Sequence, residues 1–210
     1  MKTKGKVSVK QLERYPVYLN FLLSLRNSDI DKVSSKQLAE ALNCSEEQVR
    51  KDLQVVAPNS SKPGCLRDVN ALIAYLKEYL GFNKVNQAIL VGVGHLGSAF
   101  LSFKGFLDYG LDIIAGFDIE PSITGTTIND KPIYSIFSLD NKIKELGVKV
   151  AIVTTPKEVT QEVVNKLINS GIKAIWNFAH VDLAVPDDVI VENVHLSESL
   201  MTLSYNLSRR

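Results

Sequence analysis

Residues 87–97 read QAILVGVGHLG, and this stretch decides the fold. Its apolar run, residues 88–91, has the composition of a buried parallel strand. The glycines that follow have the spacing Gly-x-Gly-x-x-Gly, and a helical pattern begins at residues 98–101. A strand, a glycine turn and a helix in this order predict the phosphate-binding turn of a Rossmann fold.

Each glycine of this turn has a role in binding a dinucleotide. Gly92 permits the tight turn, Gly94 lets the backbone approach a pyrophosphate, and Gly97 lets the helix pack closely on the strand. The start of the helix offers unpaired N–H groups and a partial positive charge to the phosphates. The candidate cofactor-binding residues of the turn are Gly92, Val93, Gly94, His95, Leu96 and Gly97.

Asp118 ends a second apolar run, residues 113–117, and lies about 20 residues after the last glycine. An acid at this position binds the adenosine ribose hydroxyls. Its carboxylate would repel a 2′-phosphate, and residues 119–121 (Ile-Glu-Pro) supply no arginine to hold one. NAD(H) is therefore favoured over NADP(H). Two alternatives stay open: a glycine turn that binds nothing, and one that binds another phosphate compound such as coenzyme A.

The composition is that of a globular protein with one large or two small domains, since 45% of the 210 residues are hydrophobic and 22% are charged. The apolar runs are too short to span a bilayer, and no apolar segment of a secretory signal follows the basic residues 1–6. Cys44 and Cys65 are too few for a disulfide framework and are not spaced as a metal site. We therefore expect a cytoplasmic protein without a membrane or metal partner.

The N-terminal part has the signature of a helix-turn-helix. Apolar spacing predicts a first helix over residues 14–25. Ser34 and Gln37 can form a capping box that opens a short helix. Asn43 suits the tight turn after it, and Ser45 with Gln48 offers a second capping box. The last of these helices would enter a major groove, and the candidate DNA-binding residues are Ser34, Ser35, Ser45, Gln48, Arg50, Lys51 and Lys62.

Charge and loops support this interpretation. Residues 1–82 contain 13 Lys/Arg and 9 Asp/Glu (net +4), whereas residues 83–210 contain 11 and 14 (net −3), so the N-terminal part suits a polyanion. Residues 57–64 are rich in helix breakers and predict a wing or loop. Asp68 can cap a helix over residues 69–80, and Gly81 ends it. Residues 1–82 are thus expected to form a winged-helix DNA-binding domain. A purely structural helical hairpin is the alternative.

Residues 83–195 are expected to form the Rossmann domain. Further strands are predicted at residues 133–134, 149–155, 172–178 and 189–194, after a polar loop at 121–130. Helices are predicted over residues 139–146 and from Pro156, in the first turn, to about residue 170. Strands alternating with helices give an α/β fold with a doubly wound parallel sheet. Ligands bind at the carboxyl ends of such strands, so candidates for the nicotinamide half are Thr154, Thr155, Pro156, Asn177 and Phe178.

Residues 196–210 follow the completed sheet as an amphipathic helix, with leucines at positions 196, 200, 203 and 207. Its apolar stripe can pack on its own subunit or insert into a twofold partner. Either arrangement buries the same stripe, and both stay open at this point.

The sequence resembles the Rex family of bacterial redox-sensing transcriptional repressors. The matching segments include RYPVY (14–18), VSSKQLAEAL (33–42), QVRKDL (48–53), LVGVGHLG (90–97), TTP (154–156), NFA (177–179) and VENV (191–194). The resemblance implies a homodimer with an N-terminal winged helix, a Rossmann domain that binds NAD(H), and a C-terminal dimerisation helix exchanged between subunits. It also implies that a high NADH/NAD⁺ ratio releases the protein from palindromic operators of fermentative and anaerobic genes.

Several positions depart from the family pattern. Residues 54–60 (QVVAPNS) replace the usual S-Y-F-G-x-x-G, and the wing is reduced to KPGCLR at 62–67. A tyrosine common near the nicotinamide is Phe103 here. An arginine and an aspartate that pair between subunits in many members are Asn20 and His195.

The sequence thus predicts a dimeric NAD(H)-binding repressor and not an enzyme. Three alternatives are a divergent relative with an altered operator or weakened redox response, a small NAD-dependent oxidoreductase, and a coenzyme A-binding module. The oxidoreductase would need a proton donor near the nicotinamide, and none stands out among His95, His180 and His195.

Overall fold

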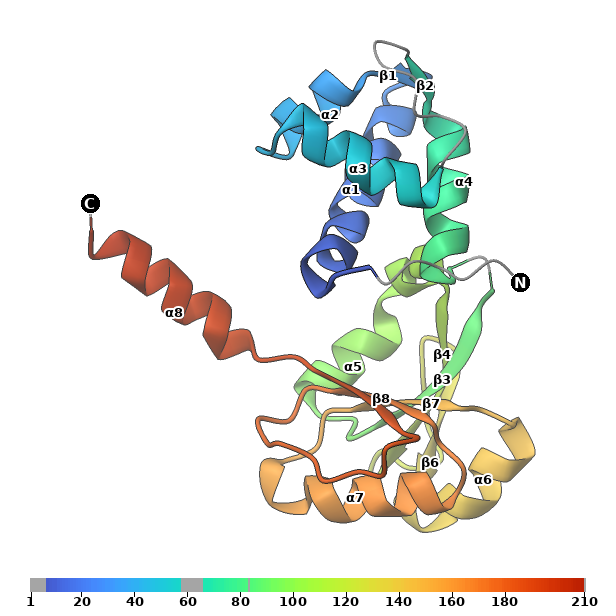
Figure 1. Ribbon diagram of the computed structural model, residues 1–210. Helices are drawn as coiled ribbons and strands as arrows, with labels where there is room; N and C mark the ends of the chain where they lie inside the picture. The colour runs from blue at the N-terminus through green and yellow to red at the C-terminus, as the bar shows by residue number, and fades with distance from the viewer. Residues whose placement is uncertain (1–6, 58–65, 83, 210) are drawn as a thin grey trace. The chain divides into compact units, whose positions relative to one another are not determined.

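A computed structural model of the chain describes residues 7–57, 66–82 and 84–209 (Figure 1). The chain divides into two compact units, Met1–Lys84 and Val85–Arg210. Each unit has its own hydrophobic core. Within the described part, no helix combines the length and the apolar character that a membrane span requires.

The first unit is a small helical fold with one pair of short strands. In chain order its elements are α1 (Val9–Asn27), β1 (Lys32–Val33), α2 (Ser35–Ala41), α3 (Glu46–Val56), β2 (Arg67–Asp68) and α4 (Val69–Leu80). Strands β1 and β2 pair antiparallel. This pair of strands was not predicted from the sequence. Most of the expected wing, including Lys62, falls on residues 58–65, outside the described residues.

Local capping residues set the helix ends of this unit. Ser8 caps α1, which therefore begins five residues before the predicted residue 14. The capping box of Ser34 and Gln37 is confirmed. Asp68 caps α4 by accepting from the Ala71 N–H at 2.8 Å, and the left-handed Gly81 ends this helix as predicted.

The second predicted capping box is only half present. Ser45 Oγ accepts a hydrogen bond from the Gln48 backbone N–H at 3.1 Å. The Gln48 side chain does not return to the cap, because its Nε2 donates to Asp52 Oδ1 at 2.9 Å instead. The Gln48 side chain thus extends along α3 to a buried carboxylate, which accepts a strong hydrogen bond from its N–H group.

The core of the first unit joins α1, α2, α3 and α4. Apolar side chains at helical spacing from each of them meet in one cluster that is almost free of solvent. Its largest fully buried members are Tyr15, Tyr18, Leu19, Leu22, Leu38, Leu53, Leu72 and Leu76.

The second unit is a seven-stranded sheet of order β5-β6-β4-β3-β7-β8-β9. All pairs are parallel except β5–β6. The strands are β3 (Asn86–Val91), β4 (Leu111–Asp118), β5 (Thr127–Ile128), β6 (Lys131–Ser135), β7 (Val150–Val153), β8 (Ala174–Asn177) and β9 (Ile190–Asn193). The six parallel strands have the Rossmann order, which confirms the predicted doubly wound sheet. The prediction of a loop over residues 121–130 was wrong at β5, a two-residue edge strand too short for a periodicity signal.

Helices cover both faces of this sheet (Figure 1). Helices α6 (Leu139–Leu146) and α7 (Lys157–Asn169) pack with Ile89, Val91 and Val153 on one face. Helix α5 (His95–Ser102) contributes Leu101 to the cluster with Leu90 and Ile152 on the other. The helix α6 has the predicted bounds, while Pro156 precedes α7 as its N-cap residue and does not lie in its first turn.

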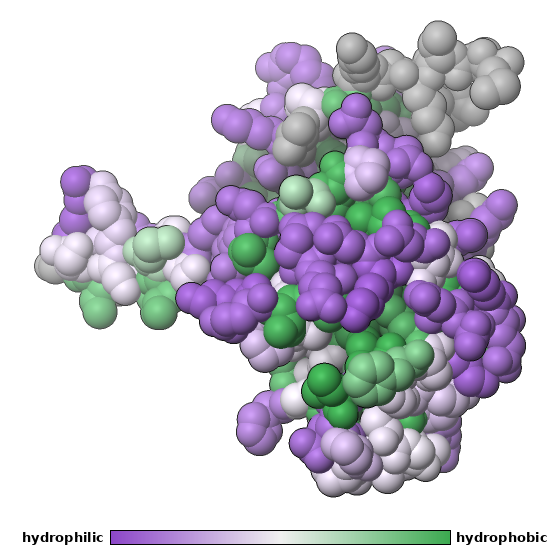
Figure 2. Space-filling model, turned by 90° about the horizontal axis from the view of Figure 1, so that it is seen from below, coloured by the Kyte–Doolittle hydropathy of each residue, from purple (hydrophilic) through white to green (hydrophobic). Residues whose placement is uncertain are grey.

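The chain ends in α8 (Leu196–Leu207), the helix predicted from the leucine spacing. Its apolar side chains are exposed, and they are visible along the helix in Figure 2. The exposed ones are Leu200, Met201, Leu203, Tyr205 and Leu207. The described residues of this single chain thus leave the stripe of α8 uncovered.

Candidate nucleotide-binding and DNA-binding sites

The strand register brings three predicted residues to one edge of the sheet. Val91 pairs with Phe117 on β4 and with Val153 on β7. The next residue of each strand end, Gly92, Asp118 and Thr154, therefore meets the others at the carboxyl edge. Backbone hydrogen bonds continue past the strands, from the Gly92 N–H to the Phe117 carbonyl at 2.9 Å and from the Thr154 N–H to the Val91 carbonyl at 3.0 Å.

Gly92 and Gly97 hold the turn by lacking side chains. Gly92 has φ +97°, and a Cβ there would lie 2.9 Å from the backbone carbon and oxygen of Thr154. A Cβ on Gly97 would overlap the carbonyl oxygen of Gly92. Neither position can accept even alanine without a backbone shift. At Gly97 the missing side chain allows the close packing of helix on strand that the sequence predicts.

Gly94 differs because, apart from its chain neighbours, no atom of the described residues lies within 4 Å of a Cβ added to it. It is the N-cap residue of α5 and supplies no side chain to the first turn of the helix. The space beside Gly94 thus adjoins the unpaired N–H groups of a helix N-terminus, and a Cβ would project into it. This geometry fits a pyrophosphate against the backbone.

Asp118 is held in place by two backbone hydrogen bonds. Its Oδ2 accepts from the Val93 N–H at 2.5 Å, and its Oδ1 accepts from the Glu120 N–H at 2.9 Å. The carboxylate thereby ties the glycine turn to the end of β4. Beside it lies a cavity of about 420 Å³, whose apolar wall includes Ile119, Phe137 and Val159. A fixed acid next to an apolar cavity suits a ribose and its base.

The residues after β7 support the turn from the other side. Thr154 Oγ1 donates to the Gly92 carbonyl at 2.6 Å, so this hydroxyl braces the turn. The hydroxyls of Thr155 and Thr160 lie 3.0 Å apart, and Thr155 and Pro156 line the same cavity as Asp118. The structure therefore brings these candidates together around one space.

Asn177 does not present its amide to a ligand. It is fully buried, and its Nδ2 donates to the Val181 carbonyl at 3.1 Å and to Asn193 Oδ1 at 2.8 Å. Its Oδ1 accepts from the Ala179 N–H at 3.0 Å. Both N–H donors of this amide and one acceptor position of its oxygen are used inside the protein, so Asn177 ties β8 to β9. Its neighbour Phe178 belongs to an aromatic cluster with Phe100 and Trp176.

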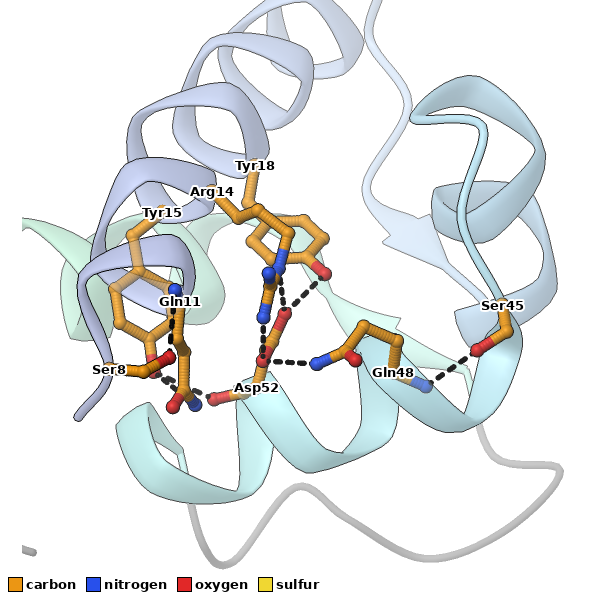
Figure 3. A network of polar contacts seen from close by, with 8 residues as sticks. All are labelled: Ser8, Gln11, Arg14, Tyr15, Tyr18, Ser45, Gln48 and Asp52. Atoms are coloured by element: carbon orange, nitrogen blue, oxygen red, sulfur yellow. Dashed lines mark hydrogen bonds and ion pairs between the residues drawn. The ribbon is translucent and has the colours of Figure 1, made fainter.

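The first unit positions α3 through a buried carboxylate, Asp52 (Figure 3). Arg14 on α1 donates to it with two nitrogens, at 2.7 and 2.9 Å. The Tyr18 hydroxyl donates to Oδ2 at 2.9 Å, and Gln48 donates to Oδ1 at 2.9 Å. Three side chains from two helices thus converge on one acid.

Hydrogen bonds and burial shift the pKa values of the side chains in this network. Burial by itself would raise the pKa of Asp52, but the hydrogen bonds from Arg14, Tyr18 and Gln48 outweigh it and hold that pKa below its usual value. The hydrogen bond to Asp52 raises the pKa of Arg14. Burial raises the pKa of Tyr15, whose hydroxyl donates to the Asp52 carbonyl, to about 12. At neutral pH the network therefore contains one carboxylate, one guanidinium and neutral phenols.

Sequence reasoning missed Asp52, although a signal was present. Val49, Asp52, Leu53 and Val56 have the spacing of a buried helix face, and all four are buried. An acid within such a stripe requires a buried partner. Arg14, in the first predicted helix, was available for this role.

Comparisons with known proteins identify the family. A profile described as "Putative DNA-binding protein N-terminus" matches residues 6–54, and one described as "CoA binding domain" matches residues 83–181. A redox-sensing transcriptional repressor Rex of Clostridium kluyveri is 38% identical over 204 residues, which cover 97% of each chain. The chain belongs to the Rex family. A Rex repressor of Bacteroides fragilis is 37% identical over 98% of this chain and 94% of that relative.

Solved Rex structures match the chain over nearly its whole length. RSP, a Rex-family repressor, in complex with β-NAD⁺ and operator DNA has a TM-score of 0.90 and 35% identity, and the match covers 97% of this chain and 94% of that one. The complex of RSP with β-NADH has a TM-score of 0.88 and the same identity, covering 97% and 95%. The fold and its order of domains are therefore those of a Rex repressor.

Phe103 and His195 are two departures from the Rex-family pattern, and Phe103 lines a cavity with Leu111 and Asp112 at the start of β4. Phe103, which replaces the common tyrosine, ends α5 and is exposed, with its ring 4.9 Å from that of Phe106. His195, which replaces an aspartate, stacks on His180 with ring centroids 6.3 Å apart. Sequence reasoning did not pair these two histidines, because they are 15 positions apart and belong to no motif. Among the described residues, no group of His, Cys, Asp and Glu could hold a metal ion.

The candidate DNA-binding residues fall into three groups. Ser34 and Ser45 are helix caps, while Ser35 is buried and accepts from Arg67 Nη1 at 2.6 Å. Gln48 is half-buried, and its Nε2 donates a hydrogen bond to Asp52. Arg50 and Lys51 present the cationic groups at the surface of α3, and each is paired with a glutamate. Because Ser35 is buried, its hydroxyl is not part of the surface that could contact DNA.

Proposed function

We propose that this chain is a Rex-type transcriptional repressor that binds double-stranded DNA as a homodimer and leaves its operator when it binds NADH. One observation carries the proposal: a chain with the overall fold of RSP keeps open space at Gly94, where the Rossmann turn would meet a pyrophosphate. RSP itself was solved with β-NAD⁺ and operator DNA and with β-NADH. The function is regulatory, not enzymatic.

The cofactor would lie along the carboxyl edge of the sheet. Gly92 to Gly97 would hold the pyrophosphate, Asp118 the adenosine ribose, and the cavity lined by Ile119 and Phe137 the base. The predicted contacts that remain are Val93, His95, Leu96, Phe103, Thr154, Thr155, Pro156 and Phe178. We leave Asn177 out of the direct contacts because its side chain is buried and both of its N–H donors are used inside the protein.

The DNA-binding surface would be centred on α3, with Arg50 and Lys51 as its cations. Asp52 fixes the helix on α1 and thus determines how its outer face meets the groove. Ser34, Ser45, Gln48 and Lys62 remain proposed contacts. We assign residues 1–82 to DNA binding, 83–195 to NAD(H) and 196–210 to dimerisation.

A homodimer would give the exposed stripe of α8 a partner. Side chains such as Leu200, Leu203 and Leu207 lose contact with water if the helix inserts into a second copy. A twofold dimer presents two copies of α3 and therefore matches a palindromic operator. A repressor of genes acts where the bacterial chromosome lies, so we propose a cytoplasmic location, with fermentation and anaerobic genes as its targets.

Fluorescence anisotropy tests the proposal directly. The protein first selects duplexes from a random library, and a labelled selected duplex is then titrated with protein at two salt concentrations, because non-specific binding weakens steeply with salt. NADH, NAD⁺ and coenzyme A are added to the complex separately. We expect release by NADH at much lower concentration than by NAD⁺, and none by coenzyme A. A duplex that stays bound at saturating NADH contradicts the redox switch.

A second candidate is a divergent repressor with a weakened redox response. Phe103 favours it, because this residue lacks the hydroxyl that the family commonly has near the nicotinamide. Phe103→Tyr distinguishes the two candidates. If the response is already weakened, the added hydroxyl increases the difference between NADH and NAD⁺; if the response is complete, it changes little.

A further inference from the structure

The two cations of α3 are already engaged within their own helix. The sequence of α3 contains two basic residues, Arg50 and Lys51, and each lies one turn after a glutamate. Lys51 Nζ is 2.7 Å from Glu47 Oε1, and Arg50 Nη1 is 3.5 Å from Glu46 Oε1. The outer face of α3 therefore presents two cation–carboxylate pairs and not two unpaired cations.

Both pairs are at the surface, where a phosphate can compete for the cation. The side chains of Lys51 and Glu47 are 68% and 70% exposed, and those of Arg50 and Glu46 are 39% and 42% exposed. The hydrogen bond from Lys51 lowers the pKa of Glu47, so this carboxylate stays charged at neutral pH. A DNA phosphate that binds Lys51 therefore competes with Glu47 for its ammonium group.

The glutamates also occupy the end of α3 that would otherwise attract DNA. Glu46 and Glu47 are in the first turn, directly after the cap Ser45. The N-terminus of a helix carries a partial positive charge, and a recognition helix turns this end toward the bases. Two carboxylates there cancel the attraction and repel the phosphates on either side of the groove.

We propose that Glu46 and Glu47 lower the affinity of the protein for DNA of unrelated sequence by competing with phosphates for Arg50 and Lys51. The proposal rests on the proposed DNA-binding function and extends it to the affinity for DNA of unrelated sequence. Sequence-independent binding depends almost wholly on phosphate contacts. The free energy needed to weaken both ion pairs therefore lowers this binding in full. Contacts to base edges can offset that cost on an operator, and only there.

A purely structural role for the glutamates predicts the opposite result. Acids in the first turn and Glu–Lys pairs at i, i+4 both stabilise an isolated helix. If stabilisation were their only role, their removal would loosen α3 and weaken binding to every duplex. The sign of the change in DNA affinity therefore distinguishes the two roles.

The test measures the binding of the full-length protein to a labelled duplex of unrelated sequence by anisotropy. Glu46→Gln/Glu47→Gln is expected to bind this duplex about three- to tenfold more tightly than wild type at low salt, and the gain is expected to shrink as salt screens the charges. Glu78→Gln removes a matched charge from the exposed surface of α4 in the same unit and is expected to change affinity by less than about 1.5-fold.

A double-mutant cycle tests whether Glu47 acts through Lys51. We expect Glu47→Gln to tighten binding in the wild-type background and to have a smaller effect in Lys51→Gln. An equal gain in both backgrounds overturns the competition, because Glu47 would then repel DNA without regard to Lys51. Unchanged or weaker binding of the double glutamine variant also overturns it.

The operator duplex in the same titration distinguishes failure of this proposal from failure of the function. If wild type binds the operator and the variants gain nothing on unrelated DNA, only the role of the glutamates is wrong. If wild type binds neither duplex, the proposed DNA-binding function is wrong and this inference fails with it.

Discussion

The contact between α1 and α3 and the glycine turn after β3 position their elements by opposite means. At the first, Asp52 is buried and bonded to Arg14, Tyr18 and Gln48, so charged and polar side chains hold the helix. At the second, the absence of side chains at Gly92 and Gly97 lets backbone meet backbone. The first region therefore depends on side-chain hydrogen bonds, and the second depends on the absence of side chains at two glycines.

This difference predicts opposite sensitivities to mutation. In the first unit, removing a side chain should be costly because it leaves a buried polar group without its partner. In the glycine turn, adding a methyl group should be costly because it overlaps the backbone. Gly94 is the informative exception, since its added methyl group would project into open space beside the described residues.

The largest expected effect is that of Asp52→Ala. Arg14 and Tyr18 would lose their buried acceptor, and the free energy of unfolding of the first unit should fall by about 3–4 kcal/mol. Urea unfolding followed by the helical circular dichroism signal measures this. Asp31→Ala, which removes an exposed acid from the same unit, is the control and should cost less than about 0.5 kcal/mol. Equal losses for the two variants would contradict the role of Asp52.

Acid should remove the same stabilisation without mutation. The folded state lowers the pKa of Asp52, so its contribution is fully present above the unfolded value, about 4, and is lost as pH falls through the lower folded value. Wild type should therefore lose stability more steeply than Asp52→Ala below about pH 4. Unfolding curves at a series of pH values compare the two proteins. Parallel pH profiles would mean that Asp52 titrates alike in both states.

Gly97→Ala should destabilise the second unit by about 3 kcal/mol, because the methyl group overlaps the Gly92 carbonyl. Trp176 is the single tryptophan and lies on β8, so its fluorescence during urea unfolding reports this unit. A loss below about 0.5 kcal/mol would show that α5 shifts at little cost.

Gly94→Ala should separate binding from folding. Stability should stay within about 0.5 kcal/mol of wild type, while affinity for NADH should fall at least about tenfold, because the methyl group fills the place proposed for the pyrophosphate. Quenching of Trp176 fluorescence by NADH measures binding. Wild-type affinity in this variant would mean that the phosphates lie elsewhere.

The smallest effect is expected at the cap of α3. Ser45→Ala should cost about 1 kcal/mol, because only the hydrogen bond from the Gln48 N–H is lost. Ser34→Ala provides the comparison, since Ser34 takes part in a complete capping box. If both cost the same, the missing half of the Ser45 box has no energetic consequence.

The sequence predicts backbone features of this molecule better than its side-chain networks. The glycine turn, the alternation of strands with helices and the ends of α4 and α6 follow from local rules on glycine, capping and apolar runs. The hydrogen bonds of Asn177 to Asn193 and of Ser35 to Arg67 do not follow from local rules. In each pair the two residues are distant in the sequence and meet only in the fold. Asp52 lies between these cases, since its place in an apolar stripe predicts a buried partner without naming Arg14.

The most direct test of the central claim compares wild type and Gly94→Ala on one operator duplex. Each complex is titrated with NADH and with NAD⁺, and release is followed by anisotropy. We predict that NADH releases wild type at much lower concentration than NAD⁺ does, and that Gly94→Ala needs at least about tenfold more NADH for release than wild type does. Release of both proteins at the same NADH concentration would contradict a switch operated from the glycine turn.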